Sequence, residues 1–148
     1  TSSPHEMQRY LSKISGPLLD RIDIHIEVTP VPFEKLSEEQ KAESSVEIRK
    51  RVTAAREIQS ERFVQMENIH YNAQMNTKHI REYCALDDVS KQLLKTAMER
   101  LNLSARAYDR ILKVARTIAD LDAAPIVVSS HIAEAIQYRS LDRDGWLG

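Results

Sequence analysis

Glycine is scarce in this chain of 148 residues, which contains only Gly16, Gly145 and Gly148. Loops that wrap the phosphates of a nucleotide need closely spaced glycines, because their backbone N–H groups must approach the phosphate. Neither a G-x-x-x-x-G-K-[ST] loop nor a G-x-G-x-x-G turn occurs in the sequence. We therefore expect that this chain does not enclose a nucleoside triphosphate by itself and is inactive alone in any reaction that consumes one.

Cysteine, long apolar runs and net charge are also limited. The single cysteine, Cys84, excludes an internal disulfide and fits a reducing compartment. No apolar run reaches the roughly 18 residues that a membrane span needs, and no signal peptide is visible. The net charge is -1, so no field over the whole molecule attracts nucleic acid or a membrane. The sequence predicts a cytoplasmic protein with no membrane partner.

The five histidines and Cys84 lack the spacing of metal ligands, because no H-x-x-x-H or C-x-x-C pair is present. We predict no metal site. Cys84 is interpreted as a packing residue rather than a nucleophile.

Most of the chain has apolar residues at helical spacing, with capping residues before each run. Ser3 and Glu6 form one capping box and Ser44 and Glu47 another, whereas Thr77, Asp87 or Asp88, Ser104 and Ser130 are the other expected helix starts. These signals predict helices over residues 4–14, 18–21, 44–64, 77–84, 88–101, 104–121 and 130–140. Between the second and third of these helices, residues 29–41 read as a linker or loop.

One segment has the period of a strand. Ile22, Ile24, Ile26 and Val28 alternate with polar residues, which predicts a half-buried strand. Because a lone strand is unstable in water, we expect its sheet to lie outside this sequence. The absence of an initiator methionine also suggests a fragment. The predicted fold class is mainly α: a helical bundle preceded by the last helix and strand of an α/β core.

Arg21 lies between Asp20 and Asp23, where the predicted helical turn meets the strand. In one interpretation it is a structural arginine that pairs with either aspartate. In the other, the flanking carboxylates orient a guanidinium that cannot lose its charge, and this guanidinium binds a phosphate of this molecule or of a neighbour.

Arg106 lies in the first turn of the helix that begins after Ser104. The helix dipole disfavours a cation there, by roughly 0.3–1 kcal/mol when it is exposed. A cation beside free N–H groups makes a site for an anion, above all a phosphate. The alternative is a solvated arginine on the polar face of the helix.

The segment EIRKRVTAAREIQSERF carries a third basic cluster, with Arg49, Lys50, Arg51 and Arg56. It could contact nucleic acid. It could equally be a solvated face that nearby glutamates balance. No aromatic residues interleave to stack on bases, which weakens the first interpretation.

Three segments, RYLSKISGPLLDRIDIHIEV, LNLSARAYDRILKVARTIADL and HIAEAIQYRSLDR, resemble magnesium-chelatase-like AAA+ ATPases of the ComM/YifB type. This resemblance implies that residues 1–29 are the end of an ATPase core, residues 30–43 a linker, residues 44–140 a helical lid domain and residues 141–148 a tail. The Walker A and Walker B segments would then lie upstream.

The resemblance also assigns roles to the two arginines. Arg21 corresponds to an arginine finger that acts in trans, and Arg106 to the sensor 2 residue that contacts nucleotide. ATP and Mg²⁺ would be bound by the full-length protein, with none expected on this fragment. The expected partners are neighbouring subunits of a hexameric ring, and DNA that the ring acts on during branch migration in natural transformation.

Two other functions remain open at this point. The chain could belong to the ATPase motor subunit of a metal chelatase, since relatives of the same type drive metal insertion into porphyrins. It could also be a helical protein-interaction module without nucleotide coupling.

Overall fold

The computed structural model describes residues 3–33 and 42–139, and the regular elements within these ranges are all helices. The mainly α fold is therefore confirmed, whereas the described residues show nothing of an α/β core. The α-helices are α1 (Pro4–Leu11), α2 (Gly16–Leu19), α4 (Ser45–Arg62), α5 (Thr77–Tyr83), α6 (Asp88–Arg100), α7 (Ala105–Leu121) and α8 (Ser129–Gln137), and the 3₁₀ helix η1 spans Asn72–Gln74. Within the described ranges, no helix is long and apolar enough to cross a membrane.

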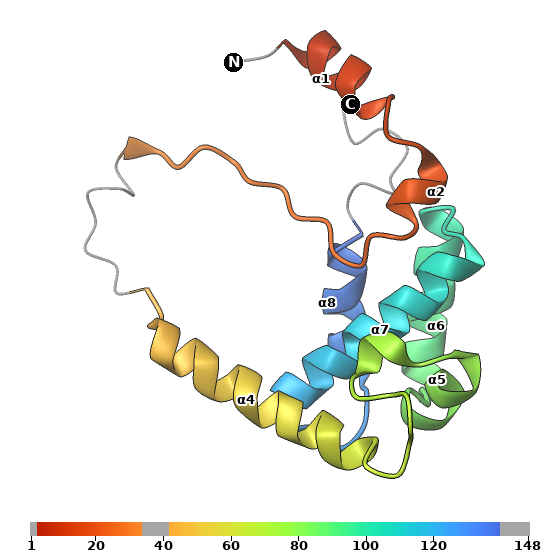
Figure 1. Cartoon of the computed structure of the whole chain (residues 1–148). Coiled ribbons are helices and arrows are strands. Elements are labelled where there is room, and N and C mark those ends of the chain that lie inside the picture. The colour runs from red at the N-terminus through yellow and green to blue at the C-terminus, as the bar shows by residue number, and fades with distance from the viewer. Residues whose placement is uncertain (1–2, 34–41, 140–148) are drawn as a thin grey trace.

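Helix α7 is the centre of the bundle. It packs against α8, α4, α5 and η1, and α8 in turn packs against α6 (Figure 1). Helix α1 stands apart from this bundle, and the extended segment after α2 leads away from it (Figure 1). The helices that pack together therefore all come from the part of the chain that follows residue 44.

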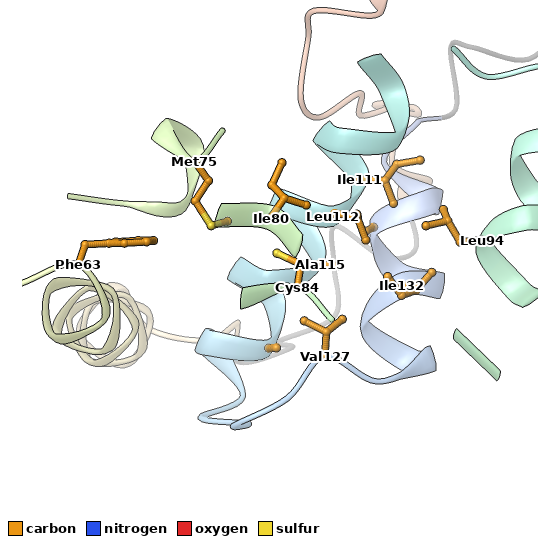
Figure 2. Close-up of a cluster of buried hydrophobic side chains, with 12 residues drawn as sticks. Phe63, Met75, Ile80, Cys84, Leu94, Ile111, Leu112, Ala115, Val127 and Ile132 are labelled. Carbon is orange, nitrogen blue, oxygen red and sulfur yellow. The ribbon is translucent and has the colours of Figure 1, made fainter. Parts of the chain in front are cut away.

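Apolar side chains from several helices meet around α7 and form the core (Figure 2). Ile111, Ala115 and Ala119 recur at spacings of four residues along α7 and are fully buried. This spacing places them on one face of the helix, which explains why α7 is the element that the others cover. The remaining buried members of the core are Phe63, Met75, Ile80, Cys84, Leu94, Leu112, Val127, Ile132 and Ala135.

The predicted helix starts agree with the structure in four cases. The side chains of Ser3, Ser44, Asp87 and Ser104 each accept a hydrogen bond from the backbone N–H group three residues on, over 2.7–3.3 Å. Such a bond satisfies a donor that the helix itself cannot pair. At Asp87, the bond from the N–H group of Ser90 also lowers the pKa of the carboxyl group.

Two predicted starts are wrong. Helix α5 is capped by Asn76 rather than Thr77, because the Asn76 side chain accepts from the N–H groups of Lys78 and His79. Helix α8 begins at Ser129, so Ser130 is not its cap. At this start, Nδ1 of His131 accepts a hydrogen bond from the Val128 N–H group at 3.1 Å.

The predicted strand over residues 22–28 is not formed, and its apolar residues are not buried. Ile24, Ile26 and Val28 are exposed by 47%, 70% and 88%, whereas His25 is buried. A strand is stable only when a neighbour pairs with its backbone. No other described segment runs beside this one as a strand, so its isoleucines have no sheet against which to pack.

Apolar residues at helical spacing predict that Tyr108 and Leu121 face inward on α7, together with Ile111 and Ala115. The structure differs, because Tyr108 and Leu121 are about 40% exposed. Arg116 and Asp120 are buried instead, because they pair with each other inside the bundle. The tail predicted for residues 141–148 lies outside the described residues.

Candidate functional site

Arg21 lies in the turn that follows α2. The turn is closed by backbone hydrogen bonds from Arg21 N–H to Leu18 and from Ile22 N–H to Leu19, at 3.0 and 3.1 Å. The Arg21 side chain is exposed and makes no hydrogen bond or ion pair with any described residue. The expectation that Asp20 or Asp23 holds this guanidinium is therefore wrong, and the group remains available for an anion.

Asp23 pairs instead with Arg110, a residue of α7. This ion pair ties the segment after α2 to the second turn of α7, and Figure 1 shows the two lying next to each other. The attraction of Arg110 is the physical reason why Asp23 does not orient Arg21. The sequence offers no signal for this pair, because its members are 87 residues apart.

Arg106 lies one helical turn before Arg110 on α7. Its side chain is exposed, and within residues 3–33 and 42–139 it has no hydrogen-bond or ion-pair partner. The helix start beside it carries the positive end of the helix dipole, where an anionic ligand is favoured.

Arg21 thus lies in the turn after α2 and Arg106 in the first turn of α7. Both guanidinium groups are exposed and uncompensated by described residues. A guanidinium forms paired hydrogen bonds with two oxygens of a phosphate and stays charged at any physiological pH. Phosphate oxygens are therefore the ligands that these two residues fit.

The basic residues of α4 are partly balanced by acidic neighbours. Lys50 pairs with Glu47 and Arg51 with Glu43, each at 2.9 Å. All four side chains are well exposed, so these pairs lie in solvent. The pairs favour the interpretation of this cluster as a solvated helix face rather than a surface reserved for nucleic acid.

One arginine of the same segment has a different place, which the sequence pattern did not reveal. Arg62 donates hydrogen bonds to the carboxylate of Asp120 and to Asn72, and Arg116 donates to the same carboxylate. The Asp120 side chain is fully buried. This ionic cluster joins α4, η1 and α7, so its role is to hold the bundle together. The only hint in the sequence is that Arg116 and Asp120 are four residues apart.

The other side-chain clusters and cavities of the described residues do not bring together groups that would bind one kind of ligand. Among the described residues, no group of three histidine, cysteine or acidic side chains could hold a metal ion. A cavity of about 420 Å³ lies between α5, α6 and α7, and its charged lining residues are of both signs: Arg81, Lys91 and Asp109. Cys84 also lines this cavity, and burial raises the pKa of that thiol to about 11.

Two family models match the chain. The model described as "Magnesium chelatase, subunit ChlI C-terminal" matches residues 42–139, more than half of the sequence, and "Magnesium chelatase, subunit ChlI" matches residues 1–36. The chain belongs to the magnesium chelatase ChlI family. Arg21 lies in the segment matched by the second of these models, and Arg106 in that matched by the first.

Several curated relatives agree with this assignment. Competence protein ComM of Haemophilus influenzae is 43% identical over 143 residues, which are 96% of this chain and 27% of that protein. The protein YifB of Escherichia coli is 40% identical over 142 residues, and a Mycobacterium tuberculosis protein is 33% identical over 132. The magnesium-chelatase-like resemblance of the ComM/YifB type is therefore confirmed. The chain spans about a quarter of the length of these relatives.

Proposed function

We propose that this chain supplies two arginines to ATP hydrolysis in a ring-shaped motor of magnesium-chelatase-like subunits. Arg21 would act as the arginine finger on ATP bound by a neighbouring subunit. Arg106 would act as the sensor 2 residue and contact the nucleotide of its own subunit. The observation that carries the proposal is the exposed Arg21 guanidinium, which no described residue neutralises, in a chain of this family.

Phosphoryl transfer is accelerated by positively charged side chains close to the γ-phosphate. Negative charge develops around the γ-phosphate as its bond to the leaving group breaks, and a finger arginine supplied in trans is worth about 10³–10⁵ in rate. Arg21 suits this role because it is exposed and permanently charged. Arg106 suits contact with a phosphate because it is exposed at the start of α7. A change of the bound nucleotide there would act directly on the central helix of the bundle.

ATP and Mg²⁺ would be shared with residues outside the described ranges. The two arginines fit the phosphates of ATP, whereas the described residues include no cluster of metal ligands. In ATP hydrolysis, Mg²⁺ bridges the phosphate oxygens and neutralises part of their charge. The contribution of this chain is then to bring positive side chains to a nucleotide that other residues hold.

The proposed substrate of the motor is DNA, with branch migration in natural transformation as the proposed process. This proposal rests on the ComM type of resemblance and on the relative named a competence protein. The second candidate is the motor of a metal chelatase, which the description of the family favours. A helical module without nucleotide coupling is the third, and it predicts that neither arginine affects ATP turnover.

The first experiment measures ATP turnover of the full-length protein that carries this sequence, with Arg21→Ala. We expect kcat to fall by about 10³–10⁵, because the transition state loses its trans charge. The affinity for a fluorescent ATP analogue should stay unchanged, since the finger acts on the breaking bond. Arg9→Ala, which removes another exposed arginine, is the control and should keep full turnover. Normal turnover in Arg21→Ala would refute the finger assignment.

A mixing experiment tests whether Arg21 acts in trans. Arg21→Ala subunits and Arg106→Ala subunits are each expected to turn over ATP poorly. In a mixed ring, an Arg21→Ala subunit with an intact Arg106 receives an intact finger from an Arg106→Ala neighbour. Mixing should therefore restore part of the turnover. No recovery, with mixed rings demonstrated by tagged subunits, would contradict action in trans.

The substrate is tested by stimulation of the ATPase. Branched DNA should raise the turnover of the wild-type protein, while linear duplex DNA of equal length serves as the control. Stimulation by a porphyrin-bearing chelatase partner, without an effect of DNA, would favour the second candidate instead.

A further inference from the structure

Arg139, which follows α8, is a buried arginine that the proposed function does not use. Only 1% of the residue is exposed. One of its terminal nitrogens donates to the carbonyl oxygen of Ile22, and the other donates to that of Leu19 at 3.3 Å. These two carbonyls lie on either side of Arg21 in the chain. The guanidinium therefore spans the turn that carries the proposed finger.

Two further contacts attach the same segment to the bundle. The N–H group of His25 donates to the carbonyl oxygen of Tyr138 at 2.6 Å, next to Arg139. Asp23 forms the ion pair with Arg110 of α7. The segment from residue 19 to residue 25 is thus held by α7 and by the end of α8.

An arginine is suited to this attachment in a way that a lysine is not. Its planar guanidinium directs several N–H groups along fixed directions, so it can donate to two carbonyls at once. The ammonium of a lysine is a compact point charge on a flexible stem and lacks this fork. Because the bonds go to backbone oxygens, they fix the path of the main chain from which the Arg21 side chain projects.

We propose that Arg139 is a positioning residue for Arg21. Its hydrogen bonds to the carbonyl oxygens of Leu19 and Ile22 make the Arg21 turn move together with α8 and the bundle. The inference rests on the proposed function, because it assigns Arg139 a role only if Arg21 acts on ATP. It joins the segments matched by the two family models, residues 1–36 and 42–139, into one working unit.

The test is Arg139→Lys in the full-length protein, assayed beside Arg21→Ala. We expect kcat to fall about 10- to 100-fold, since a misplacement of about 1 Å can cost about 10² in rate. The affinity for the ATP analogue should not change, because Arg139 is not proposed to contact nucleotide. The double variant Arg21→Ala/Arg139→Lys should turn over ATP no more slowly than Arg21→Ala, since a finger that is absent cannot be misplaced.

Arg116→Lys is the matched control. Arg116 is a buried arginine of the same bundle that donates to the backbone carbonyls of Ala124 and Pro125, away from the Arg21 turn. Both lysine variants should lower the melting temperature. Below that temperature, only Arg139→Lys should lower kcat. Hydrogen exchange should likewise speed up in residues 17–26 for Arg139→Lys and not for Arg116→Lys.

The outcomes separate this inference from the proposal on which it rests. If Arg21→Ala turns over ATP normally, the finger assignment fails and the positioning role fails with it. If Arg21→Ala is impaired while Arg139→Lys matches Arg116→Lys, only the positioning role is overturned. Should Arg139→Lys fail to fold, Arg139→Gln is assayed beside Arg116→Gln instead, because it removes the fork on the two carbonyls without leaving a charge buried. A severalfold loss of kcat in Arg139→Gln alone would support the role, and an unchanged kcat would overturn it.

Discussion

Two residues in the left-handed backbone region follow the ends of α6 and of α7, the helix that carries Arg106. Asn102 follows α6 with φ 47°, and Ala123 follows α7 with φ 52°. In both places the next residue returns a hydrogen bond to the carbonyl five residues earlier, from Leu103 to Met98 at 3.0 Å and from Ala124 to Ala119 at 2.8 Å. This is the Schellman arrangement, in which glycine or asparagine normally takes the left-handed position.

Ala123 is the residue that fits this position poorly, because its Cβ approaches the following carbonyl oxygen. The left-handed conformation costs an L-residue roughly 1–2 kcal/mol, part of which glycine forfeits through the greater freedom of its unfolded chain. We expect Ala123→Gly to raise the free energy of unfolding by about 0.5–1 kcal/mol, measured by urea denaturation. The matched control is Ala133→Gly within α8, where the same change should destabilise by about 1 kcal/mol. Losses at both positions would contradict the strain at Ala123.

At the scale of elements, the buried ionic cluster decides how α4 is attached to α7. The Asp120 carboxylate on α7 accepts from Arg62 of α4, from Asn72 of η1 and from Arg116. The main chain of Asn72 is also held, since its N–H group donates to Gln59 of α4 at 2.9 Å. Within these elements, every oxygen of the buried carboxylate therefore has a charged or amide donor.

Asp120→Ala should destabilise the protein by about 3–5 kcal/mol, because it leaves two guanidinium groups without their shared carboxylate inside the bundle. Thermal unfolding followed by circular dichroism measures the loss. Asp122→Ala is the control two residues later. The Asp122 side chain is 69% exposed and makes one contact, with Nε2 of the buried His131 at 3.0 Å. The loss of a single hydrogen bond of this kind should cost about 1 kcal/mol. Equal losses in the two variants would show that the cluster does not hold α4.

At the scale of the whole molecule, the features that the sequence predicted correctly are those that depend on neighbouring residues along the chain. The capping residues and the apolar spacing of α7 were enough to place most helices, because these signals act within one or two turns. The buried pair of Arg116 and Asp120 was missed, since periodicity assigns charged residues to the solvent side. The strand over residues 22–28 was predicted from alternation alone, and alternation does not show whether a neighbouring strand is present.

In the candidate site, too, local features could be predicted from the sequence and long-range contacts could not. Arg21 and Arg106 could be chosen from the sequence because charge, neighbours and helix position are local properties. The expected partners of Arg21 were wrong because Asp23 is taken by Arg110, a residue distant in the chain. Arg139 was not chosen at all, since its bonds go to backbone carbonyls 117 and 120 residues away. Contacts of this kind leave no pattern in a single sequence.

The pH dependence of folding tests the core as a whole through Cys84. Burial raises the pKa of this thiol from 9.0 to about 11, and nearby Arg116 opposes the shift only in part. Between these two values the unfolded chain releases a proton that the folded protein keeps. The stabilising contribution is therefore complete below about pH 9 and is lost as the pH rises toward 11, by up to about 3 kcal/mol. Urea denaturation at intervals from pH 7 to pH 11 should show this decline.

Cys84→Ala separates the thiol from other groups that titrate in the same range. Burial also raises the pKa of Tyr83 and of Tyr138, so some decline at high pH will remain in the variant. The difference between the two curves should be flat up to about pH 9 and then shrink, since the wild type loses stability that the variant never had. Parallel curves up to pH 11 would mean that the thiol ionises as easily in the folded protein as in the unfolded chain. Cys84 would then be reached by water, and the packing of α5 against α7 would be looser than its 3% exposure implies.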